Sequence, residues 1–116
     1  ERLSDIVVAF LRANAAAGAD ALQLFDSWVG ALSATDYATH VRPHVRRIFA
    51  ELQDVGLPLV HFGTNTAHLL DLVKDEGGSI IGLDWRVPLD VAWARVGHHL
   101  GVQGNLDPAV LHAPLP

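Results

Sequence analysis

Four short apolar runs, each preceded by a segment of helical periodicity, constrain the fold of this chain more than any other feature. The runs cover residues 21–25, 58–63, 79–84 and 100–105. Each has the length of a strand and is mostly apolar rather than strictly alternating, which is typical of parallel strands that are covered on both faces. The runs start about 20 to 40 residues apart, which is the spacing of βα units. The pattern therefore predicts a regular alternation of helix and strand.

The segments of helical periodicity carry apolar residues three and four positions apart. They cover residues 3–18, 33–56, 64–76 and 88–98, and the first three end at glycines. Ser33 is placed to cap the second segment. Pro43 lies inside that segment and predicts either a kink or a delayed start of the regular helix.

Two architectures use this alternation, an open doubly wound sheet and a closed barrel. The open sheet usually has a glycine-rich phosphate loop after its first strand, but the sequence contains neither GxGxxG nor GxxxxGK[ST]. The predicted fold class is therefore α/β, a (β/α)8 TIM barrel. Residues 1–116 are expected to be one partial barrel domain of about four parallel strands. The chain opens in a helical pattern at Glu1 and ends without a closing element, so we expect it to be truncated at both ends.

Composition argues against several classes of site and partner. The chain has no cysteine, which removes disulfides, thiolate zinc sites and cysteine nucleophiles. Its net charge is −5, and its 8 lysines and arginines form no basic stripe, so no nucleic-acid partner is expected. No apolar run reaches the roughly 18 residues that span a bilayer. We therefore expect a soluble, cytoplasmic protein with no membrane partner.

Polar side chains follow each predicted strand, at the edge where α/β proteins place their functional residues. These residues are Asp26, Ser27, Trp28, Thr64, Asn65, Asp84, Trp85, Arg86, Gln103, Asn105 and Asp107. For Thr64, Thr66 and Asp107, capping of loops and helices is the preferred interpretation. For the pairs at 26–27 and 84–85, a functional and a structural role remain equally open.

None of the histidines is predicted to be catalytic. Asp36, His40 and His44 could share one helical face, but the HExxH context of a metal site is missing and the helix should lie outside the barrel. We therefore expect a solvated stripe and no metal. His61 lies within a predicted strand and is expected to be a hydrogen-bonded interior residue. Ser27 does not lie in a GxSxG motif, which argues against a serine hydrolase.

Three stretches resemble the uroporphyrinogen decarboxylase family: LQLFDSWVG at 22–30, IGLDW at 81–85 and VQGNLDP at 102–108. The resemblance extends over essentially the whole chain and includes RIF at 47–49 and HFG at 61–63. It implies a (β/α)8 barrel that acts as a carbon–carbon lyase in haem and porphyrin biosynthesis. The implied reaction removes carbon dioxide from the acetate side chains of uroporphyrinogen, giving coproporphyrinogen, without a metal or organic cofactor. It also implies a homodimer.

Placed on the family, the chain would span roughly the fourth to seventh strands of the barrel. The resemblance implies that Ser27 binds the substrate and that Phe25, two residues earlier, lines the cleft. It implies no catalytic residue in this segment, because the family's arginine-rich stretch, pyrrole-binding aspartate, cleft tyrosine and late histidine belong to other strands. The segment alone is therefore expected to be inactive. It is also expected to self-associate, because half a barrel exposes strand edges and an apolar face.

Two alternatives remain open on the residues. The first is a corrinoid or coenzyme M methyltransferase, which shares the barrel but binds zinc through histidine and cysteine. The absence of cysteine argues against it here. The second is a non-catalytic remnant built from barrel pieces.

Overall fold

Each of the four apolar runs contains a strand of one parallel sheet. The strands of the computed structural model, which describes residues 2–114, are β1 (Leu22–Phe25), β2 (Leu59–Phe62), β3 (Ile80–Gly82) and β4 (Gly101–Gln103). Their order in the sheet is β1-β2-β3-β4 and every pair is parallel. Because strands that follow one another in the chain are neighbours in the sheet, the connections always progress in one direction, as they do around a barrel. The prediction of a partial α/β barrel sheet is confirmed.

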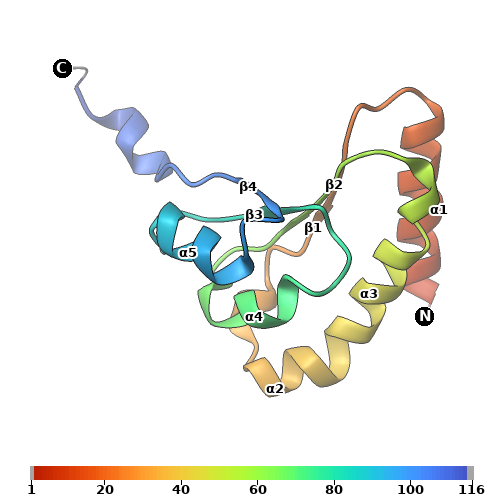
Figure 1. The fold of residues 1–116 in the computed structure, drawn as a ribbon, viewed down its shortest axis with the longest axis horizontal. Helices are drawn as coiled ribbons and strands as arrows, with labels where there is room; N and C mark the ends of the chain where they lie inside the picture. The colour runs from red at the N-terminus through yellow and green to blue at the C-terminus, as the bar shows by residue number, and fades with distance from the viewer. Residues whose placement is uncertain (1, 115–116) are drawn as a thin grey trace.

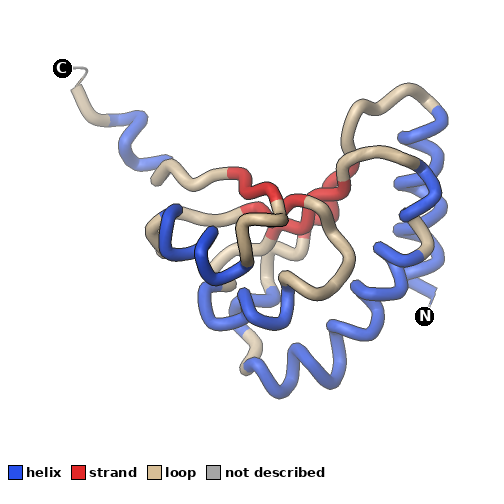
Figure 2. Tube along the Cα trace, viewed as in Figure 1, coloured by secondary structure: helices blue, strands red, loops and turns tan. Residues whose placement is uncertain are grey.

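The helices lie along one side of this sheet (Figure 1), and the strands form the middle of the molecule (Figure 2). The α-helices are α1 (Arg2–Ala16), α2 (Ala34–Asp36), α3 (Arg42–Ala50), α4 (Leu70–Val73) and α5 (Leu89–Val96). The single turns are η1 (Val29–Ala31), η2 (Tyr37–Val41), η3 (Gln53–Val55), η4 (Ala67–Leu69) and η5 (Pro108–His112). Within residues 2–114, no helix has the length and apolar character needed to cross a membrane.

The second helical segment confirms both local predictions. The Ser33 hydroxyl accepts a hydrogen bond of 3.1 Å from the backbone N–H of Asp36 and so caps α2. Pro43 lies in the first turn of α3, after the wide π turn η2, so the regular helix starts late. The third segment is shorter than predicted, because residues 64–66 form a loop and α4 covers one turn only.

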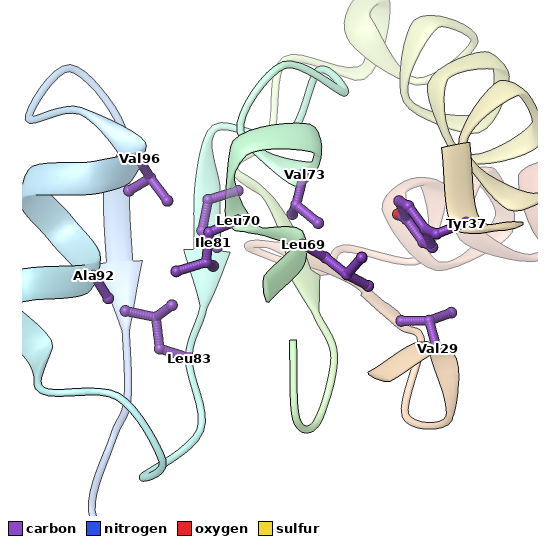
Figure 3. Close-up of a cluster of buried hydrophobic side chains, with 9 residues drawn as sticks. All are labelled: Val29, Tyr37, Leu69, Leu70, Val73, Ile81, Leu83, Ala92 and Val96. Atoms are coloured by element: carbon purple, nitrogen blue, oxygen red, sulfur yellow. The ribbon is translucent and has the colours of Figure 1, made fainter. Parts of the chain in front are cut away.

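Alternate residues of a strand point to opposite faces of the sheet. The apolar residues on the helical face pack against the helices, so the hydrophobic core lies between the sheet and the helices. One cluster of buried residues, drawn in Figure 3, consists of Val29, Tyr37, Leu69, Leu70, Val73, Ile81, Leu83, Ala92 and Val96. A second consists of Val8, Leu11, Leu22, Val45, Ile48, Phe49, Leu52 and Leu59.

The opposite face of the sheet carries no helix in the described part of the chain. Phe25 is 66% exposed there, and its ring meets the ring of Phe62 edge to face at 5.8 Å. Phe62 in turn lies over Gly82, where a Cβ atom would stand 2.7 Å from the Phe62 ring. In a closed barrel this face is the packed interior.

Candidate functional site

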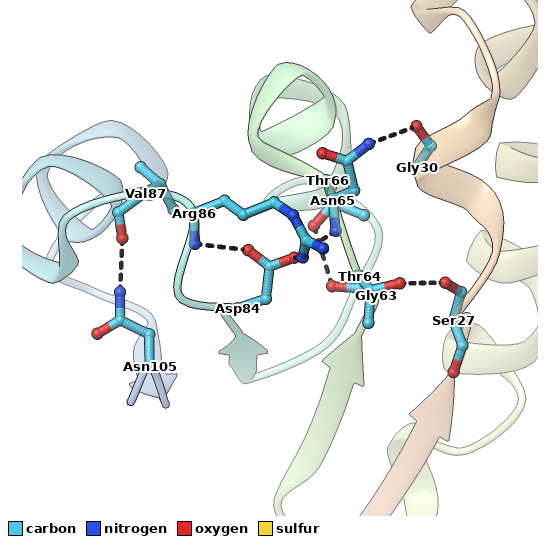
Figure 4. A network of polar contacts seen from close by, with 10 residues as sticks. All are labelled: Ser27, Gly30, Gly63, Thr64, Asn65, Thr66, Asp84, Arg86, Val87 and Asn105. Carbon is cyan, nitrogen blue, oxygen red and sulfur yellow. Dashed lines mark hydrogen bonds and ion pairs between the residues drawn. The ribbon is translucent and has the colours of Figure 1, made fainter. Parts of the chain in front are cut away.

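The loops after β1 and β2 are tied to each other at the carboxyl edge of the sheet. The Thr64 hydroxyl donates a hydrogen bond to the carbonyl oxygen of Ser27. The Asn65 side-chain amide donates to the carbonyl of Gly30 at 3.3 Å. Gly30 is needed for this approach, because a Cβ atom there would stand 2.2 Å from the Thr64 carbonyl oxygen. Figure 4 shows both bonds.

Asp84 connects the loops after β2 and β3. Its carboxylate accepts hydrogen bonds from the backbone N–H of Asn65 and from the backbone N–H and guanidinium of Arg86, the latter two at 3.0 and 2.6 Å. The residue is 7% exposed, and this burial raises the pKa of the Asp84 carboxyl; the hydrogen bonds and the Arg86 charge outweigh burial and hold that pKa below its usual value. The Asp84 carboxylate is therefore already hydrogen-bonded to residues of both loops, which favours a structural role for Asp84 over a functional one. Beside it, the Arg86 guanidinium lies 4.0 Å from the centre of the Trp85 ring.

Replacing Asp84 by asparagine should lower the free energy of unfolding at pH 7 by about 1.5–3 kcal/mol, the contribution of hydrogen bonds to a charged group. Because the pKa of Asp84 is depressed in the folded chain, its stabilisation is present above its unfolded pKa and is lost as pH falls through the folded value. Urea unfolding at neutral and acidic pH measures this. Equal losses for Asp84→Asn at both pH values would contradict the assignment.

The loop after β4 is tied back to the loop after β3. The Asn105 amide donates to the carbonyl of Val87 at 2.5 Å, and the Asp107 carboxylate caps η5 by accepting from Ala109 N–H at 2.9 Å. The Thr66 hydroxyl donates to the carbonyl of Gly63 at 3.2 Å. Thr64, Thr66 and Asp107 thus have the capping and loop-joining roles preferred from the sequence, whereas the Gln103 side chain is exposed on the last strand.

Ser27 and Phe25 lie together at the end of β1. With Asp26, Trp28, Val29 and Leu32 they line an open hollow of about 430 Å³. Ser27 is half-buried, and Figure 4 shows its hydroxyl on the side of the residue away from the Thr64 contact. Trp28 is 88% exposed beside it. The two residues expected to meet substrate therefore share one hollow at the strand edge.

Behind β1 and β2, on the helical side of the sheet, His61 is buried between two carboxylates. Its Nδ1 atom lies 3.1 Å from a Glu76 oxygen and its Nε2 atom lies 3.8 Å from an Asp26 oxygen. Glu76 also accepts a hydrogen bond of 3.0 Å from the Tyr37 hydroxyl and faces the Arg42 guanidinium at 3.7 Å. Sequence reasoning expected an interior His61 but missed Glu76 and Tyr37, because no local pattern marks a carboxylate that becomes buried through distant contacts.

The pKa values in this cluster follow from burial and from the two carboxylates. Burial lowers the pKa of His61, but the contacts with Asp26 and Glu76 outweigh it and leave that pKa above the usual value. Burial, together with the neighbouring Glu76 charge, strongly raises the pKa of the Tyr37 hydroxyl, which therefore stays protonated. The two carboxylates face opposite ring nitrogens of His61 and do not converge on one point. In residues 2–114 no three histidine, aspartate or glutamate side chains are placed to hold a metal ion.

The Asp36, His40 and His44 set does not form a site. Asp36 accepts a hydrogen bond of 2.7 Å from the Ser33 hydroxyl, at the cap of α2. His40 and His44 are exposed and border a different hollow, of about 410 Å³, between α1, β1 and α3.

Comparison with known proteins adds a family to this geometry. The family model described as uroporphyrinogen decarboxylase (URO-D) matches residues 1–116. Proteins named uroporphyrinogen decarboxylase are 58% identical in Sorangium cellulosum, 57% in Thermobifida fusca and 54% in Thermus thermophilus. The matches cover 97%, 97% and 98% of this chain but 32%, 31% and 33% of those relatives, so the chain spans about a third of their length. With a match over all of its residues, the chain belongs to the uroporphyrinogen decarboxylase family.

Proposed function

We propose that this chain supplies the fourth to seventh βα units of a uroporphyrinogen decarboxylase, a cofactor-free carbon–carbon lyase of porphyrin and haem biosynthesis. The observation that carries the proposal is the match over the whole chain, at more than half identity, to proteins with that name. The geometry supports it, because Ser27 and Phe25 lie at the carboxyl edge and on the helix-free face of a parallel sheet, where a barrel binds its substrate.

The proposed reaction needs an acid and a site for an anionic tetrapyrrole. Protonation of a pyrrole carbon makes the ring an electron sink. The bond from the acetate methylene to its carboxylate then breaks, its electron pair enters the ring, and carbon dioxide leaves. The methylene takes up a proton and the ring releases its own, so one acetate and one proton give one methyl group and carbon dioxide.

Ser27 and Phe25 are the residues of this chain that we assign to substrate binding. The Ser27 hydroxyl can donate or accept a hydrogen bond, and the exposed Phe25 ring offers an apolar wall. The cations that neutralise the substrate's carboxylates are assigned to other parts of the barrel, because Arg86 is already paired with Asp84 and Arg42 faces Glu76. We assign no catalytic acid to the described residues. A homodimer in the cytoplasm is part of the same proposal.

The test uses a completed chain, in which the matching 113-residue stretch of this chain replaces its counterpart in the Sorangium cellulosum relative. We expect the completed chain to release carbon dioxide from uroporphyrinogen and to form coproporphyrinogen, and the 116-residue chain alone to form none. A soluble, folded completed chain without this activity would contradict the proposal.

Ser27→Ala in the completed chain should lower kcat/KM for uroporphyrinogen by about 10- to 100-fold, the range of one lost hydrogen bond to a charged or polarised group. Ser33→Ala is the matched control, because it removes a hydroxyl that caps α2 and does not line the hollow, although the neighbouring Leu32 does. It should lower stability but leave kcat/KM within about twofold. Equal effects of the two substitutions on kcat/KM would show that Ser27 does not contact the substrate.

A further inference from the structure

The charge count around His61 does not balance if its imidazole is neutral. Two carboxylates, Asp26 and Glu76, and one guanidinium, Arg42, face the ring or its partners. The side chains of His61 and Glu76 are 3% and 0% exposed. The Asp26 and Arg42 side chains are each 23% exposed, so only the contact between His61 and Glu76 is dry. With both carboxylates ionised, a neutral imidazole would leave one net negative charge beside that dry contact, where an uncompensated charge is costly. An imidazolium brings the cluster to neutrality.

The geometry points the same way. A neutral imidazole carries one N–H group and one lone pair, and here each ring nitrogen faces a different carboxylate. In either tautomer, one lone pair would therefore point at a negatively charged oxygen. Asp26 Oδ2, Arg42 Nε, His61 Nδ1 and Glu76 Oε1 are buried without a hydrogen-bond partner among residues 2–114. Attraction between opposite charges, rather than aligned hydrogen bonds, thus stabilises these atoms.

We infer that His61 is a buried imidazolium that restrains Asp26 and so positions the β1 loop that carries Ser27. The inference rests on the proposed function and extends it to a positioning residue on the far side of the sheet. Asp26 is the link: its backbone N–H donates to the Phe62 carbonyl at 2.7 Å, and the adjacent Ser27 carbonyl accepts from Thr64. With the Asp26 side chain held by His61 on the helical side, rotation of the 26–27 peptide is restricted, and the Ser27 hydroxyl stays at the hollow.

The protonation state of His61 should affect the KM for uroporphyrinogen. Because its folded pKa is raised above the unfolded value, its stabilisation is complete below the unfolded pKa and is lost as pH rises through the folded pKa. The other titratable and charged groups that face the cluster are Tyr37, Arg42, Asp26 and Glu76, with the exposed His40 and His44 bordering the hollow beside Asp26. KM for uroporphyrinogen should therefore rise as the pH increases through the folded pKa of His61. His40→Gln and His44→Gln should leave that rise unchanged.

The decisive experiment is a double-mutant cycle in the completed chain. His61→Gln leaves two carboxylates facing one guanidinium, and we expect KM to rise about tenfold while kcat changes by less than about threefold. Adding Glu76→Gln restores neutrality, so the double variant should recover most of the lost affinity. A merely structural role predicts the opposite, since removing both partners would damage the site at least as much as removing one. A double variant with a KM as high as His61→Gln, or higher, would overturn the inference.

A direct measurement keeps the inference testable if a variant fails to fold. Nitrogen chemical shifts of histidines labelled with ¹⁵N, in the unmodified completed chain, should show both His61 nitrogens predominantly protonated at pH 6.5, where an ordinary imidazole is half protonated. A neutral His61 tautomer would overturn the inference whatever the kinetics show. If the completed chain binds no uroporphyrinogen but His61 is an imidazolium, the proposed function fails and the charge assignment stands.

Discussion

Replacing Phe49 by alanine is expected to lower the free energy of unfolding by about 3–5 kcal/mol, the usual cost of truncating a buried aromatic side chain. Phe49 is 1% exposed, and its ring centre lies 5.4 Å from that of His61. A Cβ atom at Gly78 would be 3.6 Å from its ring, so the polypeptide closes around it on that side too. The substitution therefore leaves a cavity and also removes an apolar wall of the charged cluster. The shift of the urea midpoint of the completed chain, at unchanged slope, measures the loss.

Two control substitutions separate the cavity from a general effect of mutation. Phe49→Leu keeps most of the buried volume and should cost clearly less than alanine. Val91→Ala removes a side chain from the exposed face of α5, where it is half in solvent, and should change stability by no more than about 0.5 kcal/mol. A Phe49→Ala loss as small as that of Val91→Ala would mean that α3 does not pack on the sheet as described.

Replacing Gly30 by alanine should disturb the site more than the small size of the added methyl group suggests. The new methyl group would stand 2.2 Å from the carbonyl oxygen of Thr64 and 2.6 Å from that of Asn65, and both are backbone atoms that cannot rotate away. The β1 and β2 loops must therefore separate, which should cost about 1–3 kcal/mol of stability. Ser27 lies in the displaced loop. A displacement of about 1 Å at a reacting site can lower the rate about 100-fold, so under the proposed function we expect a fall of that order in kcat/KM of the completed chain for uroporphyrinogen.

Gly78→Ala is the matched glycine control. A Cβ atom there would meet the Leu59 carbonyl oxygen at 3.4 Å and the His61 Cβ atom and the Phe49 ring at 3.6 Å, and these ordinary van der Waals contacts require no residue to move. Gly78 does not line the Ser27 hollow. We expect kcat/KM within about twofold of the unmodified protein. If Gly30→Ala behaved like Gly78→Ala in the kinetic assay, the close contact between the two loops would not be important for Ser27.

The strands were predictable because burial of a parallel strand requires a short apolar run, and that requirement is local. The runs at 21–25, 58–63 and 79–84 contain β1, β2 and β3, each trimmed by one to three residues. The rim residues were predictable for the same reason, since polar side chains directly after a strand must lie at its carboxyl end. The resemblance carried by 22–30, 81–85 and 102–108 supplied the family, which the comparison confirms.

The third helical segment shows where local periodicity misleads. Residues 64–76 have helical spacing, but Asn65 adopts a positive φ of 58° and its backbone N–H binds Asp84 in the next loop. Because this bond joins residues 19 positions apart, the propensity of 64–76 could not reveal it. The helix is consequently reduced to η4 and the single turn α4.

The amino-acid sequence by itself determined the alternation of helix and strand, the parallel barrel order and the family, because hydrophobic period and short motifs are properties of neighbouring residues. Only the tertiary structure decided which polar side chains pair with other residues of the chain. The Asp84 carboxylate hydrogen-bonds a neighbouring loop, and His61 lies between Asp26 and Glu76. These contacts join residues that are 15 to 35 positions apart in the sequence. Those contacts form only when the folded sheet brings the loops together. A charged side chain that is buried there is then stabilised by the opposite charge beside it.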